Sequence, residues 1–163
     1  MKLSSQQKVT GLIVTAIVAA LVIAVLSISH LPWRVPDDFS IQWRSGGGQL
    51  PARTEAVIAV SGSYWDFYDG RGGEPQRFTF TTSPDELRDL YGVLRRNSVD
   101  RLKYRSAMIY DGDNAGFSLL WGDKNISVWG LAVIPVQQAR YRAAYLRIQE
   151  FLEEKVPNHP DYR

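Results

Sequence analysis

The stretch SPDELRDLYGVLRR, residues 83–96, decides the fold of this 163-residue chain, because it carries a complete set of helix signals. Ser83 stands at the N-cap position, Pro84 at the first helical position, and Glu86 three residues after the cap. Acidic residues in its first turns and arginines at its end match the helix dipole. The predicted helix carries four apolar residues on one face: Leu87, Leu90, Tyr91 and Leu94.

Strand patterns lie on the N-terminal side of this helix. In residues 38–43, Phe39, Ile41 and Trp43 alternate with polar side chains, which is typical of a half-buried strand. We expect further strands at 55–62 and 77–82. The stretch 64–76 between them contains Asp-Gly and Gly-Gly pairs, so it is predicted to be a long loop.

On the C-terminal side, the pattern predicts a strand within 100–111 and a hairpin over 116–134 that turns at 122–125. A second helix is expected over 136–155. Its buried stripe is formed by Tyr141, Ala144, Tyr145, Ile148, Phe151 and Leu152. The order, approximately βββα-βββα, predicts an α+β two-layer domain: an antiparallel sheet with two helices on one face.

A long apolar run, residues 11–31, precedes the domain and contains no charged residue. Twenty-one helical residues span about 30 Å, the thickness of the hydrocarbon core of a bilayer. The run therefore predicts a transmembrane helix. A cleaved signal peptide stays open as the alternative, because Ser27 and Ser29 supply small residues before His30, although the run exceeds the usual signal length.

The charges that flank this run predict its orientation. Lys2 and Lys8 place the N-terminus, residues 1–10, in the cytoplasm, and the rest of the chain outside. We expect a juxtamembrane linker at 32–38, an extracytoplasmic domain at 39–156 and a tail at 157–163. Ala16, Ala20 and Ala24 repeat at a spacing of four, which permits a weak homodimer or contact with another membrane protein. Alanine is also common in membrane spans without such pairing.

Charge and composition exclude several function classes. The chain has 19 basic and 17 acidic residues, and three of the basic ones precede residue 35. The outer domain therefore has a net charge of −1, which argues against nucleic-acid binding. The absence of cysteine excludes thiol catalysis and cysteine metal sites. We expect no cofactor.

Catalytic and metal motifs are weak. The two histidines, His30 and His159, stand in segments that cannot orient a serine–histidine–aspartate triad. Residues 110–116 begin like a calcium loop but lack half of the oxygen ligands, so no metal is expected. The only carboxylates with a plausible catalytic role are Asp66, Asp69, Asp111 and Asp113.

Two stretches are candidate binding sites. In residues 63–70, aromatic rings alternate with carboxylates, an arrangement on which a sugar or peptide can stack; the alternative is that these rings close the edge of the core. Its candidate residues are Tyr64, Trp65, Asp66, Phe67, Tyr68 and Asp69. A basic stretch suits anionic headgroups or a polymer, or is simply a solvated face. It contains Arg95, Arg96, Arg101, Lys103 and Arg105.

The sequence as a whole favours a single-pass membrane protein whose outer domain is a non-catalytic binding or assembly module. The alternative is a carboxylate-dependent hydrolase that acts on cell-envelope polymer.

Overall fold

The computed structural model describes residues 14, 15, 17, 18, 29–46, 53–104 and 115–160. Within them the chain forms six strands and two long helices. The strands are β1 Ser40–Gly46, β2 Arg53–Ala59, β3 Ser63–Tyr68, β4 Gln76–Phe80, β5 Gly116–Trp121 and β6 Lys124–Trp129. The helices are α2 Pro84–Arg96 and α3 Gln138–Lys155, with short 3-10 turns η1 Val99–Arg101, η2 Gly130–Ala132 and η3 Pro135–Gln137.

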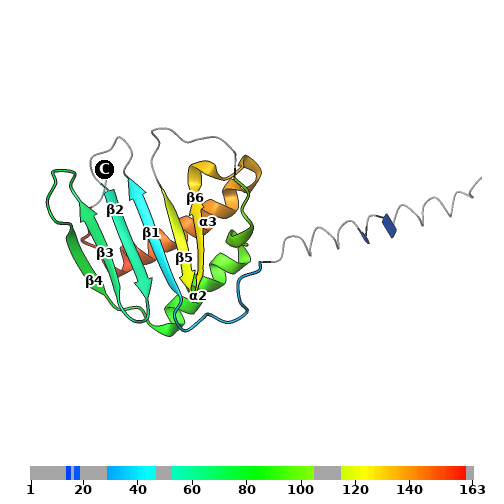
Figure 1. The fold of residues 1–163 in the computed structure, drawn as a ribbon, viewed down its shortest axis with the longest axis horizontal. Coiled ribbons are helices and arrows are strands. Elements are labelled where there is room, and N and C mark those ends of the chain that lie inside the picture. Colours follow the sequence, from blue (N-terminus) through cyan, green and yellow to red (C-terminus); the bar gives the residue numbers. More distant parts are fainter. Residues whose placement is uncertain (1–13, 16, 19–28, 47–52, 105–114, 161–163) are drawn as a thin grey trace, which may run out of the picture.

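The six strands form one antiparallel sheet in the order β4-β3-β2-β1-β5-β6, and both helices cover the same face of it (Figure 1). The central strand β1 pairs with β2 on one side and with β5 on the other. Ile41 lies opposite Ile58 and Leu119 in these two ladders, and all three are fully buried. The predicted two-layer α+β architecture is confirmed.

Helix α2 begins at the predicted cap. The hydroxyl of Ser83 accepts a hydrogen bond from the backbone N–H of Glu86, and the Glu86 carboxylate accepts one from the backbone N–H of Ser83 at 2.8 Å. The same carboxylate forms an ion pair of 2.7 Å with Lys155, at the end of α3. Glu86 therefore both caps helix α2 and links it to helix α3.

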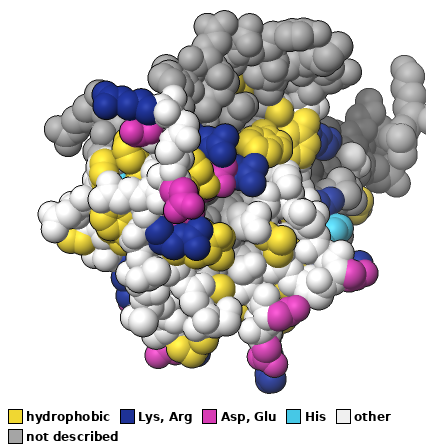
Figure 2. All heavy atoms as spheres, turned by 60° about the vertical axis from the view of Figure 1, so that its left-hand side comes forward, with side chains coloured by type: hydrophobic (Ala, Val, Ile, Leu, Met, Phe, Trp, Pro, Cys, Tyr) yellow, Lys and Arg dark blue, Asp and Glu magenta, His cyan; other side chains and the backbone are white. Residues whose placement is uncertain are grey.

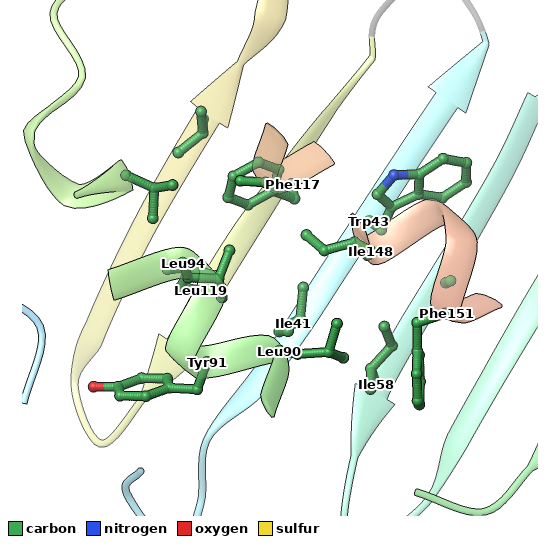
Figure 3. Close-up of a cluster of buried hydrophobic side chains, with 14 of the residues drawn as sticks. Ile41, Trp43, Ile58, Leu90, Tyr91, Leu94, Phe117, Leu119, Ile148 and Phe151 are labelled. Carbon is green, nitrogen blue, oxygen red and sulfur yellow. The ribbon is translucent and has the colours of Figure 1, made fainter. Parts of the chain in front are cut away.

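The core lies between the sheet and the helices. From α2 it receives the four predicted side chains, of which Leu90, Tyr91 and Leu94 are drawn in Figure 3. Helix α3 begins two residues later than expected, after η3, and its predicted stripe is buried apart from Tyr145, which is half-buried. Figure 3 shows Ile148 and Phe151 of α3 facing Trp43 and Ile58 of the sheet.

One expectation for an individual element was wrong. Residues 64–68, the first part of the predicted loop, belong to strand β3, Ser63–Tyr68, so four strands precede α2. The turn residues begin only at Asp69-Gly70, and before them Trp65 and Phe67 alternate with polar positions as in any strand. After α2, η1 covers the start of the range 100–111, in which a strand was predicted, and Tyr104 makes an isolated bridge to Val133. The rest of that range lies outside the described residues, so this strand stays a prediction. The described order is thus ββββα-ββα.

The predicted membrane span, with Ala16, Ala20 and Ala24, falls mostly outside the described residues. Among the residues that are described, no helix combines the length and the hydrophobicity needed to cross a membrane. The end of the apolar run does pack on the domain: Leu31 is 3% exposed and belongs to the core. The Asp100 carboxylate accepts hydrogen bonds from the Ser29 hydroxyl at 2.7 Å and from the His30 backbone N–H at 2.6 Å.

Candidate functional site

Strand β3 holds the aromatic candidate residues on two opposite faces of the sheet. Trp65 points into the core, where its ring lies edge-on to Trp43 and stacks on His159 with ring centroids 3.7 Å apart. Its indole Nε1 donates a hydrogen bond to the Thr54 hydroxyl. Phe67, on the same face, lies edge-on to His159. These two rings therefore close the edge of the core, whereas the structural alternative had assigned this role to Tyr64 and Tyr68 as well.

On the open face of the sheet, both oxygens of the Asp66 carboxylate are occupied by hydrogen bonds within the fold. Asp66 is only 2% exposed, and both of its oxygens accept hydrogen bonds from Arg77, at 2.7 Å from Nε and 2.6 Å from a terminal nitrogen. This bidentate pairing raises the pKa of Arg77. The same guanidinium lies 4.0 Å over the Tyr64 ring, and Arg53 lies 4.5 Å over Tyr68.

We call the outward residues Arg53, Tyr64, Asp66, Tyr68 and Arg77 the β3–β4 face. Seen from the β4 side, Figure 2 shows basic and acidic side chains lying next to one another. Each tyrosine ring carries a guanidinium, and the arginine that covers Tyr64 is paired with a carboxylate. The arginines of this surface are therefore already engaged by groups of the same surface.

Of the remaining catalytic candidates, the structure describes Asp69 alone. Asp69 lies in the exposed turn after β3, where its carboxylate accepts a hydrogen bond from the Arg71 backbone N–H at 2.8 Å. Asp111 and Asp113 lie outside the described residues. Across the described ranges, no group of three or more histidine and acidic side chains is placed to hold a metal ion.

The basic stretch is divided by the fold. Arg95 and Arg96 end helix α2, and a terminal nitrogen of Arg101 lies 3.5 Å from His30 Nε2. Lys103 is exposed, and its backbone N–H donates to the Gln137 side chain at 2.7 Å. Arg105 lies outside the described residues. Of the described residues of this stretch, Arg95 and Arg96 line the same cavity.

That cavity is an open groove of about 710 Å³ between residues 33–37 and one side of α2, with Val60 from the β2–β3 turn. Apolar side chains form part of its lining, and the charged groups are strongly biased to one sign. Its cations are Arg34, Arg88, Arg95 and Arg96, against one acid, Asp37. We call it the arginine groove.

Most of these cations have no counter-ion among the described residues. Arg88 is paired with Asp85 at 2.7 Å, but Arg34, Arg95 and Arg96 form no salt bridge with any described residue. The Arg95 guanidinium lies 4.5 Å over the ring of Trp33, and its Nε is buried without a hydrogen-bond partner among the described groups. Trp33 itself is 83% exposed. The groove therefore presents cations that an external anion can still neutralise.

The wall formed by residues 33–37 is fixed to the domain at both ends. Leu31 and Phe39 are buried in the core. Between them, the Tyr91 hydroxyl donates a hydrogen bond to the Pro32 carbonyl at 2.8 Å. Burial raises the pKa of Tyr91 to about 12, against the opposite effect of Arg95, so this donor keeps its proton at neutral pH. The groove is thus part of the folded domain.

A second hollow, of about 510 Å³, lies beside η2 and the start of α3. Its polar groups serve the fold: the Gln138 amide donates to the carbonyls of Gly130 and Val133, and the Tyr141 hydroxyl donates to Ala115. It presents no comparable charge.

Comparison with known proteins adds no name to these surfaces. No protein-family model matches the chain, and a search of curated proteins finds no match. The function must therefore be argued from the site itself.

Proposed function

We propose that the chain is a single-pass membrane-anchored, extracytoplasmic domain that acts as a non-catalytic binding module, and that the arginine groove is its binding surface. The observation that carries this proposal is the set of three guanidinium groups, on Arg34, Arg95 and Arg96, that the described fold leaves without a salt bridge. Cationic side chains gathered around an apolar hollow are typical of a site for an anionic ligand.

The packing of residues 29–32 bears on how such a domain is tethered. Because Leu31 is used in the core, a membrane span in this chain has to end near residue 28. Eighteen residues, the number from 11 to 28, would measure about 27 Å as a helix, which is within the range that crosses a bilayer. In this arrangement the domain follows the span directly, so the groove lies close to the membrane surface.

The state of Asp66 favours binding over hydrolysis. A general acid or base must exchange a proton with its substrate, whereas both Asp66 oxygens are bound to Arg77 in a buried site. The alternative, a carboxylate-dependent hydrolase that acts on cell-envelope polymer, would rely on Asp69, Asp111 and Asp113 instead. The contacts of Asp69 are those of a turn.

The anchor and its orientation can be tested on the full chain in its native membranes. Alkaline extraction should leave the protein in the pellet, and its intact mass should include residues 1–28. Because the chain has no cysteine, the Glu74→Cys variant, at an exposed position, can be labelled at a single site. A membrane-impermeant maleimide should label it in intact cells. Release into the supernatant, a shortened mass, or labelling only after lysis would contradict the proposal.

A further inference from the structure

We infer that the arginine groove holds the headgroup of an anionic phospholipid from the membrane in which the chain is anchored, so that the domain lies against the bilayer surface. This inference rests on the proposed anchoring, and it goes further by naming the ligand of the groove. Three properties of the groove point to this ligand: its charge, its apolar lining and its place in the chain.

The charge of the groove matches a phosphodiester. Guanidinium groups bind phosphate oxygens through paired N–H donors, and this pairing is strongest where water is partly excluded. Arg95 and Arg96 are adjacent in the last turn of α2, and Arg34 belongs to the facing segment. A single headgroup between these walls is therefore approached by cations from both sides, with only Asp37 as a lining acid.

The apolar lining distinguishes a lipid from a free anion. Inorganic phosphate has no surface to bury against hydrocarbon, whereas the glycerol and the first methylenes of a lipid do. The groove offers Trp33, Val60 and Leu87 beside its arginines. Trp33, 83% exposed, is an amphipathic ring of the kind that is enriched at the level of lipid headgroups.

The place of the groove in the chain brings it within reach of the bilayer. Trp33 is four residues after Ser29, the first residue of the packed segment. Four extended residues cover at most about 14 Å. The headgroup region of each leaflet is about 5–8 Å thick. The groove therefore lies at or next to this region as soon as the preceding residues span the membrane.

The β3–β4 face shows why basic residues alone do not define such a site. It also combines arginines with aromatic rings, but Arg77 is bound by both oxygens of Asp66, and Arg53 approaches Glu55 at 3.6 Å. An anion that approached Arg77 would have to displace an existing ion pair. An anion that approached Arg34, Arg95 or Arg96 in the arginine groove would displace no ion pair of the described structure.

The inference can be tested with the full chain in nanodiscs and a fluorophore at a single substituted cysteine. Val60→Cys places the label in the groove, on a wall remote in sequence from the anchor, and Glu74→Cys places it on an exposed turn as the matched control. Quenching by a lipid-borne quencher is compared between phosphatidylcholine discs and discs in which about a third of the lipid is phosphatidylglycerol. We expect quenching at position 60 to rise at least about two-fold in the anionic discs and to remain low at position 74.

Charge variants separate groove binding from general attraction. Arg95→Gln/Arg96→Gln should abolish the rise at position 60, whereas Arg71→Gln/Arg142→Gln, which removes two exposed arginines elsewhere, should retain it. Raising the salt concentration from about 0.1 M to about 1 M, which shortens the Debye length from about 10 Å to about 3 Å, should also reduce it. Adding free inorganic phosphate at constant ionic strength should not compete, because it lacks the apolar part of the ligand.

Each failure has a different meaning. Equal quenching in neutral and anionic discs, or a rise that survives Arg95→Gln/Arg96→Gln, would overturn the lipid site while leaving the anchor in place. Competition by inorganic phosphate would assign the groove to a free anion. Failure of the chain to insert into either kind of disc would overturn the anchoring itself.

Discussion

The β3–β4 face and the arginine groove contain the same kinds of side chain in opposite states. On the β3–β4 face, Arg77 covers a tyrosine ring and is held at 2.6–2.7 Å by a buried carboxylate. In the groove, Arg95 covers a tryptophan ring and has no carboxylate partner in the described structure. An arginine that is neutralised within the fold contributes to stability, whereas one that is not is available to a ligand. This distinction, rather than composition, separates the two surfaces.

The largest expected effect comes from breaking the ion pair of the β3–β4 face. Arg77→Met leaves the buried Asp66 carboxylate without its cation, which should lower the free energy of unfolding more than any of the changes below. Chemical denaturation of the full chain in detergent measures this loss. The double variant Asp66→Asn/Arg77→Met removes the buried charge as well and should regain much of the stability. A single variant as stable as the parent protein would show that Asp66 does not depend on Arg77.

The next effect concerns the wall of the groove. Tyr91→Phe removes the hydrogen bond to the Pro32 carbonyl and should cost about 1 kcal/mol. It should also change the alkaline stability profile. The pKa of Tyr91 is raised in the folded protein from 10 to about 12, so its contribution is complete below pH 10 and is lost as the pH rises toward 12. Denaturation between pH 9 and pH 12 should therefore show a shallower decline for Tyr91→Phe than for the parent chain, and parallel curves would refute this assignment.

A smaller effect is expected at the junction of the two helices. Glu86 forms an ion pair with Lys155 and accepts the cap hydrogen bond from Ser83. These two contacts, of which the ion pair has the larger effect, lower the pKa of Glu86 from 4.5 to about 2. A lowered folded-state pKa gives stability that is present above pH 4.5 and is lost as the pH falls toward 2. Because Glu86 is partly exposed, we expect well under about 1 kcal/mol. Glu86→Gln should lose that stability near pH 6 and differ little from the parent near pH 2, as measured by denaturation at both values. Lys155→Gln, which removes the other partner, should give the same pattern.

A small effect on folding is expected in the groove itself. Arg95→Gln/Arg96→Gln should lower the free energy of unfolding much less than Arg77→Met does, because neither guanidinium forms a salt bridge with the described residues and the variant loses only the ring contact with Trp33 and the charges at the end of the helix. The same double variant should abolish the response to anionic lipid. A large loss of stability would instead mean that these arginines are committed to the fold, and the contrast with Arg77 would disappear.

The sequence predicted those parts of the structure that local signals govern. The cap at Ser83 and Glu86 and the buried stripe of α2 involve residues three or four positions apart, so the pattern alone was sufficient. Strand β3 was missed because the glycine-rich turn after Tyr68 dominated the whole stretch, although Trp65 and Phe67 alternate correctly. The alternation typical of a strand was present in this stretch, but the glycine-rich turn was given more weight.

The two candidate surfaces were predicted unequally. The basic stretch included Arg95 and Arg96, which line the groove. Trp33 and Arg34 lie about sixty positions earlier, and only the packing of residues 29–39 brings them to α2. A tryptophan and an arginine directly after an apolar run are a signal that could have suggested this. The binding prediction for Asp66 rested on aromatic rings that alternate with carboxylates. The partner of Asp66, Arg77 on the neighbouring strand, is a tertiary contact that no local pattern specifies.

The most direct test of the contrast between the two surfaces is photo-crosslinking of the full chain in its native membranes, with benzoylphenylalanine in place of Val60 and, separately, of Glu74. Mass spectrometry then identifies what each position touches. We predict that position 60 yields an adduct with an anionic phospholipid, that Arg95→Gln/Arg96→Gln removes it, and that position 74 yields none. An adduct of position 60 with another protein, or with zwitterionic lipid in proportion to its abundance, would contradict the account.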